Sequence, residues 1–350
     1  MNKKIESDIL IIGAGPVGLF TVFEAGLLGL KCQIVDNLDK VGGQCAELYS
    51  DKPIYDVPGI PDQTADELVQ AISNQIKPFE YGLHLGQRVE EITPMESTND
   101  IKKWVIKTSD SNEFITTNIF IAAGGGSFEP RRPPNILDPD KFLNRGVAYS
   151  VRDKKNYKNK DVIIFGGGDS ALDWTVELAD IAKSITLIHR RNQFRGAPNT
   201  ESQMRELVET GNVELKTPYV IEGLEGTNSI SGVSIKHFET KETESLQCEE
   251  VLFLFGLNKK LGPIVNWGLD LKGKKISVDT ERYQTSVEGI YAVGDISDYP
   301  GKLDLILCGF HETTLAIQHA YQRCFPGKRV PFSYTTSNTK LHKILGVKVD

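Results

Sequence analysis

The stretch Gly13-Ala14-Gly15-Pro16-Val17-Gly18 is a glycine-rich turn motif, and Gly166-Gly167-Gly168-Asp169-Ser170-Ala171 repeats it 153 residues later. A short apolar run precedes each motif, at Ile9 to Ile12 and at Val162 to Phe165, and predicts a buried strand. Apolar residues at helical spacing follow each motif. This strand–turn–helix order is the context that a dinucleotide fingerprint requires. Two such motifs in tandem predict a protein that holds two dinucleotides so that electrons pass between them.

Both turns carry glycines where a dinucleotide must come close to the backbone. Glycine permits a tight turn, lets the backbone approach the pyrophosphate, and lets the helix pack closely on the strand. The helix N-terminus then offers unpaired N–H groups and the positive end of its dipole to the phosphates. We therefore expect cofactor contacts at Gly13, Gly15 and Gly18 in the first turn, and at Gly166, Gly168, Asp169 and Ser170 in the second.

The residue that ends the next strand differs in charge between the two motifs. Asp36 lies 23 positions after Gly13 and ends the expected strand Gln33-Ile34-Val35. A carboxylate at this point accepts hydrogen bonds from ribose hydroxyls and repels a 2′-phosphate, so the first motif predicts a site for FAD or NAD. The alternative is that Asp36 is an ordinary turn residue at a strand end.

The second motif offers cations at the same topological point. His189 lies 23 positions after Gly166 and is followed by Arg190 and Arg191. Guanidinium groups form paired hydrogen bonds with phosphate, so this motif predicts a site for NADP. The alternative is a solvated basic turn. The same register in both halves of the chain favours cofactor sites over both alternatives.

Length and composition limit the classes of protein that fit. The chain has 350 residues, enough for two domains with sizeable cores, and 39% are hydrophobic and 25% charged, as in a folded soluble protein. A net charge of −7 argues against general nucleic-acid binding. No apolar stretch approaches the length of a membrane span, and the first six residues leave no room for the apolar segment of a signal peptide. We expect a cytoplasmic protein that binds neither nucleic acid nor membrane.

Two segments are basic although the whole chain is acidic. From Pro130 to Lys160 there are nine Lys or Arg residues against three Asp, and from Lys328 to Asp350 there are five against one. Each segment is either a solvated surface or part of a docking face for an acidic partner.

The cysteines do not indicate a metal site or a dithiol. The five are Cys32, Cys45, Cys248, Cys308 and Cys324, and no two of them form a Cys-x-x-Cys motif or a zinc-like spacing. We therefore expect no metal. Cys45 directly follows Gly42-Gly43-Gln44, but a lone thiol is more often a packing residue than a reactive one.

Periodicity and turn residues predict the order of the elements. Helices are expected at 62–81, 170–182, 201–211 and 305–324, and strands across 88–120 and 213–255. The loop at 37–61 is long, which is typical of functional loops. The glycine cluster at 121–126 is expected to end a strand and to begin a crossover between domains, because Pro130, Pro133 and Pro134 follow it. The run at 289–295 predicts a short buried strand that ends in Gly294-Asp295.

The order of these motifs resembles that of the pyridine nucleotide-disulfide oxidoreductases, and within that superfamily it resembles thioredoxin reductase. The resemblance rests on Gly43-Gln44, Ala122-Ala123-Gly124, the run from His189 to Arg195, and Tyr291-Ala292-Val293-Gly294-Asp295. It implies an α/β fold with two Rossmann-like, three-layer nucleotide-binding domains, the second inserted into the first. Residues 1–125 and 285–350 would form the FAD-binding domain, with a C-terminal extension at 326–350, and residues 126–284 the NADPH-binding domain.

One departure narrows the resemblance. Thioredoxin reductases carry a Cys-x-x-Cys motif just before the second glycine turn, where this chain has Ala148-Tyr149-Ser150-Val151-Arg152-Asp153. This absence and the C-terminal extension are similar to the thioredoxin-reductase-like (type 2) ferredoxin–NADP reductases, as are Glu47-Leu48-Tyr49, Ile54 to Gly59, and the tail Tyr334-Thr335-Thr336-Ser337. That group implies bound FAD, NADPH, a ferredoxin or flavodoxin partner, and a homodimer.

The same resemblance assigns roles to individual residues. Asp36 would hold the adenosine ribose of FAD, Tyr49 would stack on one face of the flavin, and Asp295 would bind the ribityl or pyrophosphate part. Thr336 would close the site from the tail, where Tyr334 takes the place of a histidine present in many members. The residues that would line the flavin are Gln44, Tyr49, Val89 and Phe128; those that would bind NADPH after the second turn are His189, Arg190, Arg191 and Arg195.

The expected chemistry needs no acid or base from the protein, so we expect no catalytic residue. Hydride would pass between the nicotinamide and flavin N5, and single electrons would pass to ferredoxin or flavodoxin, while the protein holds the geometry. Two alternatives remain at this point: an NADPH-dependent quinone or disulfide reductase, and a non-catalytic flavoprotein that senses NADPH.

Overall fold

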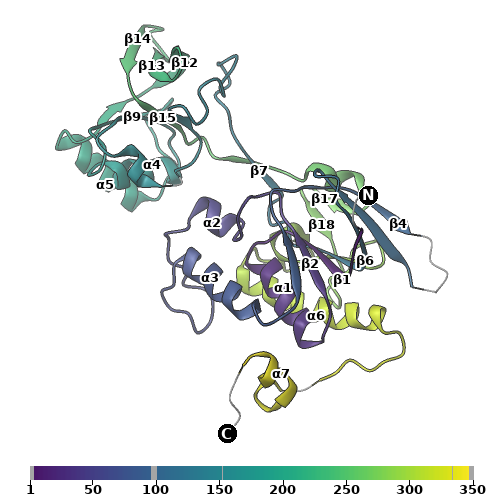
Figure 1. The fold of residues 1–350 in the computed structure, drawn as a ribbon. Helices are drawn as coiled ribbons and strands as arrows, with labels where there is room; N and C mark the ends of the chain where they lie inside the picture. The colour runs from purple at the N-terminus through teal and green to yellow at the C-terminus, as the bar shows by residue number, and fades with distance from the viewer. Residues whose placement is uncertain (1–3, 96–100, 152, 333, 347–350) are drawn as a thin grey trace. The chain divides into compact units, whose positions relative to one another are not determined.

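A computed structural model describes residues 4–95, 101–151, 153–332 and 334–346 (Figure 1). The chain divides into two compact units. The first consists of Met1–Ser127 and Lys259–Asp350, and the second of Phe128–Asn258. Each unit contains one glycine-rich turn, so the two motifs belong to separately folded parts of the chain. The expected α/β class, with the second domain inserted into the first, is confirmed.

A seven-stranded sheet forms the centre of the first unit. Its strand order is β3-β2-β1-β6-β5-β4, and β19 also pairs with β6. The strands β3, β2, β1, β6 and β19 are parallel, whereas β4, β5 and β6 form an antiparallel meander. The strands are β1 (Lys4–Ile12), β2 (Cys32–Val35), β3 (Tyr81–His84), β4 (Val89–Met95), β5 (Lys103–Thr108), β6 (Glu113–Ile121) and β19 (Ile290–Ala292).

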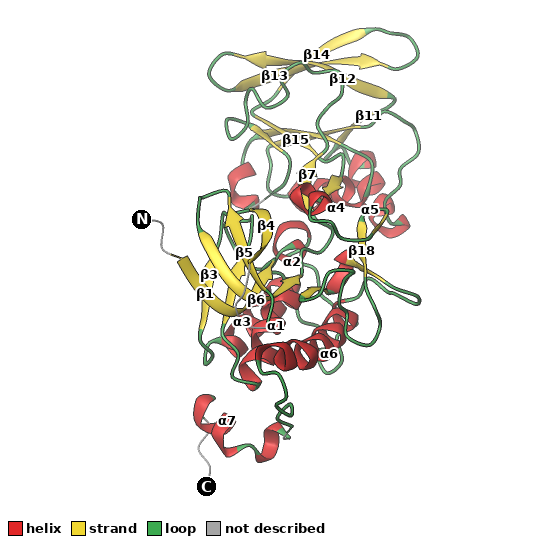
Figure 2. Ribbon diagram, turned by 90° about the vertical axis from the view of Figure 1, so that its right-hand side faces the viewer, coloured by secondary structure: helices red, strands yellow, loops and turns green. Residues whose placement is uncertain are grey.

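Both faces of this sheet are covered, so side chains of β1 alternate between two cores. Ile9 and Ile11 belong to the core under the helices α1 (Pro16–Leu27), α3 (Ala65–Ile76) and α6 (Ile306–Cys324), which Figure 2 shows grouped on one side of the sheet. Leu10 and Ile12 belong to the core on the opposite face, below the meander. Continuous apolar runs rather than strict alternation are the sequence pattern of such strands.

The helix boundaries follow from local residues. Thr64 and Glu67 form a reciprocal capping box at the start of α3. Pro16 begins α1, where a missing N–H costs nothing because the first-turn N–H groups have no intrahelical partner. The long loop at 37–61 contains one short helix, α2 (Gln44–Leu48). The expected helix at 62–81 is shorter than predicted, because α3 ends at Ile76 and residue 81 already begins β3.

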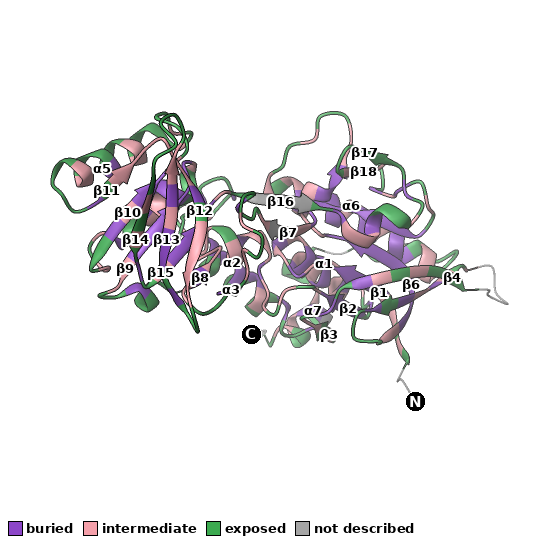
Figure 3. Cartoon of the chain, turned by 90° about the horizontal axis from the view of Figure 1, so that it is seen from above, coloured by how far each residue is buried: buried purple, intermediate pink, exposed green. Residues whose placement is uncertain are grey.

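The second unit repeats the plan with a five-stranded parallel sheet in the order β11-β10-β9-β15-β8. The helices α4 (Asp169–Leu178) and α5 (Pro198–Glu209) pack on one face, and an antiparallel sheet of three strands packs on the other. Figure 3 shows buried positions along the strands of each sheet. The strands are β8 (Val147–Ala148), β9 (Asp161–Phe165), β10 (Ser184–Ile188), β11 (Glu214–Lys216), β12 (Tyr219–Gly226), β13 (Ile230–His237), β14 (Thr243–Gln247) and β15 (Glu250–Phe253).

Short elements complete the two units. The chain crosses between the units in β7 (Ser127–Pro130) and β16 (Leu257–Lys260), which pair with each other. The remaining strands are β17 (Leu271–Lys272), β18 (Lys275–Ser277) and β20 (Ser297–Asp298), and the remaining helix is α7 (Thr339–Ile344). Single 3-10 turns are η1 (Lys154–Tyr157), η2 (Gly262–Asn266), η3 (Gly294–Ile296) and η4 (Thr335–Ser337). Among the described residues, none of the helices is both long and apolar enough to cross a membrane.

The second boundary between the units lies earlier than predicted from the sequence. The chain returns to the first unit at Lys259 rather than at residue 285. The reason is that residues 259–284 contribute to the core beneath the meander, through Leu261, Ile264, Leu269 and Ile276. The strand β18 in this segment also pairs with β20 of the first unit.

Candidate cofactor sites

The first glycine turn packs so tightly that side chains cannot be accommodated at two of its positions. Gly13 has a φ of +113°, and a Cβ there would lie 2.4 Å from Ala122 O. A Cβ on Gly18 would lie 1.9 Å from Gly13 O. These positions therefore need glycine for the fold itself, because the turn, the end of β6 and the first turn of α1 meet there.

The N-terminus of α1 is free to receive an anion. Gly15 is the N-cap, and no side chain of the described residues caps the helix. A Cβ on Gly15 would be no closer than 4.0 Å to its neighbours, Gly42 and Gly43. The first-turn N–H groups and the positive helix end are therefore available to the pyrophosphate of a dinucleotide.

Asp36 is fixed beside this turn by backbone hydrogen bonds. Its Oδ2 accepts from Ala14 N at 2.5 Å and its Oδ1 accepts from Leu38 N at 2.8 Å. Burial raises the pKa of the Asp36 carboxyl, and the two N–H groups counteract part of that rise. Each oxygen keeps a lone pair for a further donor, so ribose hydroxyls can bind at the end of β2.

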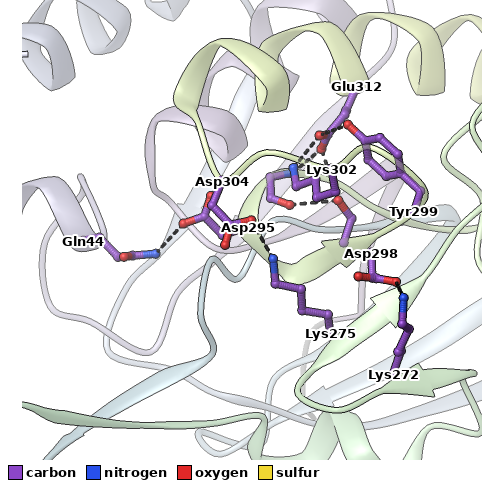
Figure 4. A network of polar contacts seen from close by, with 11 residues as sticks. Gln44, Lys272, Lys275, Asp295, Asp298, Tyr299, Lys302, Asp304 and Glu312 are labelled. Atoms are coloured by element: carbon purple, nitrogen blue, oxygen red, sulfur yellow. Dashed lines mark hydrogen bonds and ion pairs between the residues drawn. The ribbon is translucent and has the colours of Figure 1, made fainter. Parts of the chain in front are cut away.

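Gln44 and Asp295 meet at the same end of the sheet although they lie far apart in the sequence. Gln44 Nε2 donates to Asp295 Oδ2 at 3.2 Å, as Figure 4 shows. Gly42 N donates to Ala14 O at 2.8 Å, which joins the start of α2 to the first glycine turn. The structure therefore brings together Asp36, Gln44 and Asp295 around the predicted first site.

Tyr49, predicted to stack on the flavin, ends α2 and lies partly buried. Its hydroxyl contacts Cys45 Sγ at 3.5 Å, and burial raises the pKa of both groups. Val89 is buried in the core beneath the meander, at the start of β4. Phe128 lies in β7, but its side chain is outside the described part of the structure.

The tail residues are not brought to the first turn. Tyr334 is 72% exposed, and its ring contacts Phe332. Thr336 lies exposed in η4. The tail instead packs through Leu341, which is buried in the core under the helices. Within the described residues, no hydrogen bond or ring contact joins Tyr334 or Thr336 to Asp36, Gln44 or Asp295.

The second glycine turn shows the same division between packing and open positions. A Cβ on Gly166 would lie 2.6 Å from both Ala171 Cβ and Leu254 O, so this glycine is needed for packing. A Cβ on Gly168 would meet nothing within 4 Å, and Gly168 is the N-cap of α4 without a side-chain cap among the described residues. The backbone at Gly168 is therefore open to a phosphate group. Asp169 Oδ1 accepts from Ala197 N at 2.8 Å, and Ser170 is exposed.

His189 packs directly on this turn. A Cβ on Gly167 would lie within 2.5 Å of three atoms of the His189 ring, so glycine is required where the imidazole lies. The ring stacks on Phe194, with centroids 5.2 Å apart. Burial, followed by the charges of the nearby arginines, lowers the pKa of His189. At neutral pH the ring is therefore uncharged and supports the turn.

The arginines that follow His189 form a cationic surface beside the second turn. Arg190, Arg191 and Arg195 are exposed, and Arg195 N donates to Gly167 O at 2.8 Å. In the described ranges, no carboxylate pairs with any of the three guanidinium groups. Three unpaired cations beside an uncapped helix N-terminus fit the 2′-phosphate and pyrophosphate of NADPH.

A polar network occupies the position of the missing dithiol. Tyr149 OH donates to Asp140 Oδ1 at 2.7 Å, and Arg132 Nε donates to Asp140 Oδ2 at 3.0 Å. All five cysteines are free thiols, and Cys45 is buried. Among the described residues, no group of three or more His, Cys, Asp or Glu side chains is arranged to hold a metal ion.

Two residues that no sequence motif indicates, Glu312 and Lys302, lie behind the turn that carries Asp295. Glu312 in α6 is fully buried, and its carboxylate accepts from Gly294 N at 2.6 Å. Lys302 pairs with it at 2.5 Å (Figure 4). The sequence held one sign of this site: a glutamate falls on the face of α6 that also carries Gly309, Thr313 and Ala316, which are all buried.

Comparison with models of protein families assigns the chain to a family. The model of the pyridine nucleotide-disulphide oxidoreductases matches residues 7–322, which include both glycine turns. The chain belongs to this family. It is an oxidoreductase, as the resemblance predicted.

Curated relatives match over almost the whole chain. A protein of Pelagibacter ubique is 47% identical over 344 residues, which cover 98% of this chain and 99% of that protein. A protein of Bradyrhizobium sp. (strain ORS 278) is 48% identical over 348 residues, covering 99% of this chain and all of that protein. Both are named ferredoxin–NADP reductase.

Solved structures share the fold at lower identity. Thioredoxin reductase of Lactococcus lactis matches with a TM-score of 0.68 and 24% identity, over 91% of this chain and 98% of that one. Bacillithiol disulfide reductase of Staphylococcus aureus matches with a TM-score of 0.67 and 17% identity, over 90% of this chain and 98% of that one. These likenesses concern the fold alone.

Proposed function

We propose that this oxidoreductase is a ferredoxin–NADP reductase. Its cofactors are FAD and NADPH. The observation that carries the proposal is a pair of uncapped helix N-termini whose neighbouring strand ends have opposite charge. Asp36 stands at the first and the Arg190–Arg191 pair at the second. That difference suits a ribose without a phosphate in one unit and a 2′-phosphate in the other.

FAD would be held in the first unit. The N-terminus of α1 would bind the pyrophosphate, Asp36 would accept hydrogen bonds from the adenosine ribose, and Asp295 would bind the ribityl or pyrophosphate part. Tyr49 would stack on the flavin, in a place fixed by its contact with Cys45. The other residues in this proposal are Gly13, Gly15, Gly18, Gln44, Val89, Phe128, Tyr334 and Thr336.

NADPH would be held in the second unit. The N-terminus of α4 and the open backbone at Gly168 would receive the pyrophosphate. Arg190 and Arg191 would bind the 2′-phosphate, while neutral His189 supports the turn from behind. The other residues in this proposal are Gly166, Asp169, Ser170 and Arg195.

The protein itself binds and orients. Bound flavin supplies the conversion between the two-electron chemistry of a nicotinamide and the one-electron chemistry of an iron–sulfur protein. No acid or base is assigned, since His189 is neutral, packed on Gly167 and stacked on Phe194. The chain would hold the two cofactors in fixed positions and leave the flavin accessible to an electron carrier.

The carrier would be acidic, a ferredoxin or a flavodoxin. The basic segment from Pro130 to Lys160 supports this, because Lys155 and Lys158 in it are exposed and pair with no described carboxylate. Complementary charge steers such carriers onto the docking face. A homodimer and a cytoplasmic location belong to the same proposal, and light scattering after size exclusion would measure the first.

A disulfide reductase is the alternative within the same fold, and the residues present argue against it. The place of the dithiol is taken by Tyr149 in its network with Asp140 and Arg132. Cys45, the thiol in the first site, has no cysteine neighbour in the sequence, and burial raises its pKa, which disfavours the reactive thiolate.

One experiment tests the proposed function. The purified protein is expected to be yellow, with one FAD released per chain on boiling. Anaerobic NADPH should bleach the flavin, and added oxidised ferredoxin should restore the colour through many turnovers. Release of FMN or of no flavin would refute the cofactor assignment. Bleaching by NADPH without turnover on ferredoxin, flavodoxin or ferricyanide would instead identify an NADPH sensor.

A further inference from the structure

Glu312 is a fully buried carboxylate on the buried face of α6, beside Gly309, Thr313 and Ala316. Its Oε2 accepts from Gly294 N at 2.6 Å, and its Oε1 accepts from Tyr299 OH at 2.8 Å and from Lys302 Nζ at 2.5 Å. The Ser297 hydroxyl lies 3.3 Å from Oε2 and also donates to Gly294 O at 2.9 Å. Within the described residues, these donors all come from 294–302, so one side chain of α6 contacts this segment at four residues.

The partner charge is buried too. The Lys302 side chain is only 4% exposed, and the Glu312 side chain is not exposed at all. A buried ion pair is a poor means of stabilising a fold, because removing both charges from water costs about as much as their attraction returns. A carboxylate in such surroundings is better explained by what it holds in place than by the stability it adds.

The segment that Glu312 holds carries Asp295. Gly294 has a φ of +76°, and a Cβ on Gly309, one turn before Glu312, would lie 3.3 Å from Gly294 Cα and 2.4 Å from Val17 Cγ2. The turn η3 is therefore pressed against α6 and α1 at a point where only glycine fits. Within this turn, Asp295 accepts from Gln44 at 3.2 Å (Figure 4), and the backbone just before Gln44 is bonded to the first glycine turn through Gly42 N and Ala14 O.

We propose that Glu312, neutralised by Lys302, is a positioning residue that fixes η3 so that Asp295 faces the flavin nucleotide. The inference rests on the proposed FAD site. It assigns the pair a role in cofactor retention in addition to packing. The carboxylate is suited to this task because all of its partners donate. An amide at 312 would turn an N–H toward either Lys302 or Gly294 N, and one donor would lose its acceptor.

Four variants of the full-length holoprotein separate positioning from stability. Glu312→Gln leaves the Lys302 charge buried without a counter-charge. Lys302→Met with Glu312→Gln removes both charges but keeps an acceptor for Gly294 N. Lys302→Met with Glu312→Leu removes the charges and the acceptor together. Lys272→Met is the control, because Lys272 pairs at 3.0 Å with Asp298 in the same region but is exposed.

Two quantities are measured for each variant. One is the rate of flavin release on dilution, followed as the rise in flavin fluorescence. The other is the unfolding midpoint of the protein by circular dichroism. We expect Glu312→Gln and Lys302→Met/Glu312→Leu to release flavin about ten times faster or more, since each leaves a buried donor without an acceptor. Lys302→Met/Glu312→Gln should return to within about threefold of the wild-type rate, and Lys272→Met should match it.

If Glu312→Gln does not fold, the proposal is still tested, because the two double variants differ only in whether residue 312 can accept a hydrogen bond. Equal release from both double variants would overturn the proposal, as would release rates that follow the unfolding midpoints across the whole set. Absence of flavin from the wild-type protein would instead refute the proposed FAD site, so the two failures are distinguishable.

Discussion

At the scale of single residues, the selection of one nicotinamide cofactor over another depends on Arg190 and Arg191. Both are exposed, and no described carboxylate competes for them. Burial keeps the neighbouring His189 neutral, so it adds no charge of its own at neutral pH. Discrimination between NADPH and NADH therefore lies in the guanidinium groups, whose hydrogen bonds only a 2′-phosphate can accept.

Replacing both arginines by alanine should raise the Michaelis constant for NADPH and leave that for NADH unchanged. Losing one charge-assisted hydrogen bond is worth roughly 1.5–3 kcal/mol, so an increase of about ten- to a hundredfold is expected. Steady-state kinetics with ferricyanide measures both constants. Lys236→Ala, which removes a cation paired with Glu222 elsewhere in the unit, is the control. Equal increases for the two nucleotides would contradict the assignment.

What the sequence could predict at this scale depended on spacing. Asp36 and His189 stand at matching distances from their turns, and the structure places each beside its turn. Glu312 has no such register, because its partners lie 10 to 18 residues away and include a backbone N–H, so only the fold reveals the site. The roles of Tyr334 and Thr336 stay predictions.

At the scale of elements, the two glycine turns use their glycines for different purposes. Gly166 is required by packing, because a Cβ would meet Ala171 and Leu254. Gly168 has room for a side chain in the protein alone, and its φ of −107° suits any residue. A glycine that the fold does not need indicates a place that another molecule approaches closely.

Gly168→Ala should therefore fold normally and bind NADPH about tenfold or more weakly, since one methyl group blocks the pyrophosphate. Gly166→Ala should lower the unfolding midpoint, because its Cβ would lie 2.6 Å from two neighbours. Circular dichroism and nucleotide titration measure the two effects. Unchanged NADPH affinity in a folded Gly168→Ala protein would argue that the phosphates lie elsewhere.

Element boundaries were less predictable than element types. The helices after each turn, the long helix near the C-terminus and the strand at 290–292 all form. The return of the chain to the first unit was placed at 285 rather than 259, because the segment 259–284 contains no glycine turn or other motif that assigns it to a unit. What fixes that segment is contact with distant residues, such as Trp267 Nε1 donating to Glu90 O at 3.3 Å.

At the scale of the whole molecule, three histidines should make stability depend on pH. Burial lowers the pKa of His84, His189 and His319 below the ordinary value of 6.5. The folded protein then binds fewer protons than the unfolded chain, so stability is fully present above pH 6.5 and is lost as pH falls toward the folded pKa values. Urea unfolding at pH 7.5 and 5.5 should show this loss, and replacing all three by glutamine should reduce it. An unchanged loss in that variant would assign it to other groups.

Association with an acidic carrier should depend on ionic strength. Charges beyond a Debye length, about 8 Å at physiological salt, are screened, so steering by the segment from Pro130 to Lys160 should fade as salt rises. Ferredoxin reduction should slow with added salt, whereas reduction of a small neutral quinone should not. Lys155→Glu should slow association with ferredoxin at low salt and leave flavin reduction by NADPH unchanged. Lys77→Glu, an equal change of charge at an exposed residue of the first unit, is the matched control. If both variants lose the same activity, net charge and not this segment governs the encounter; if neither does, docking occurs on another face.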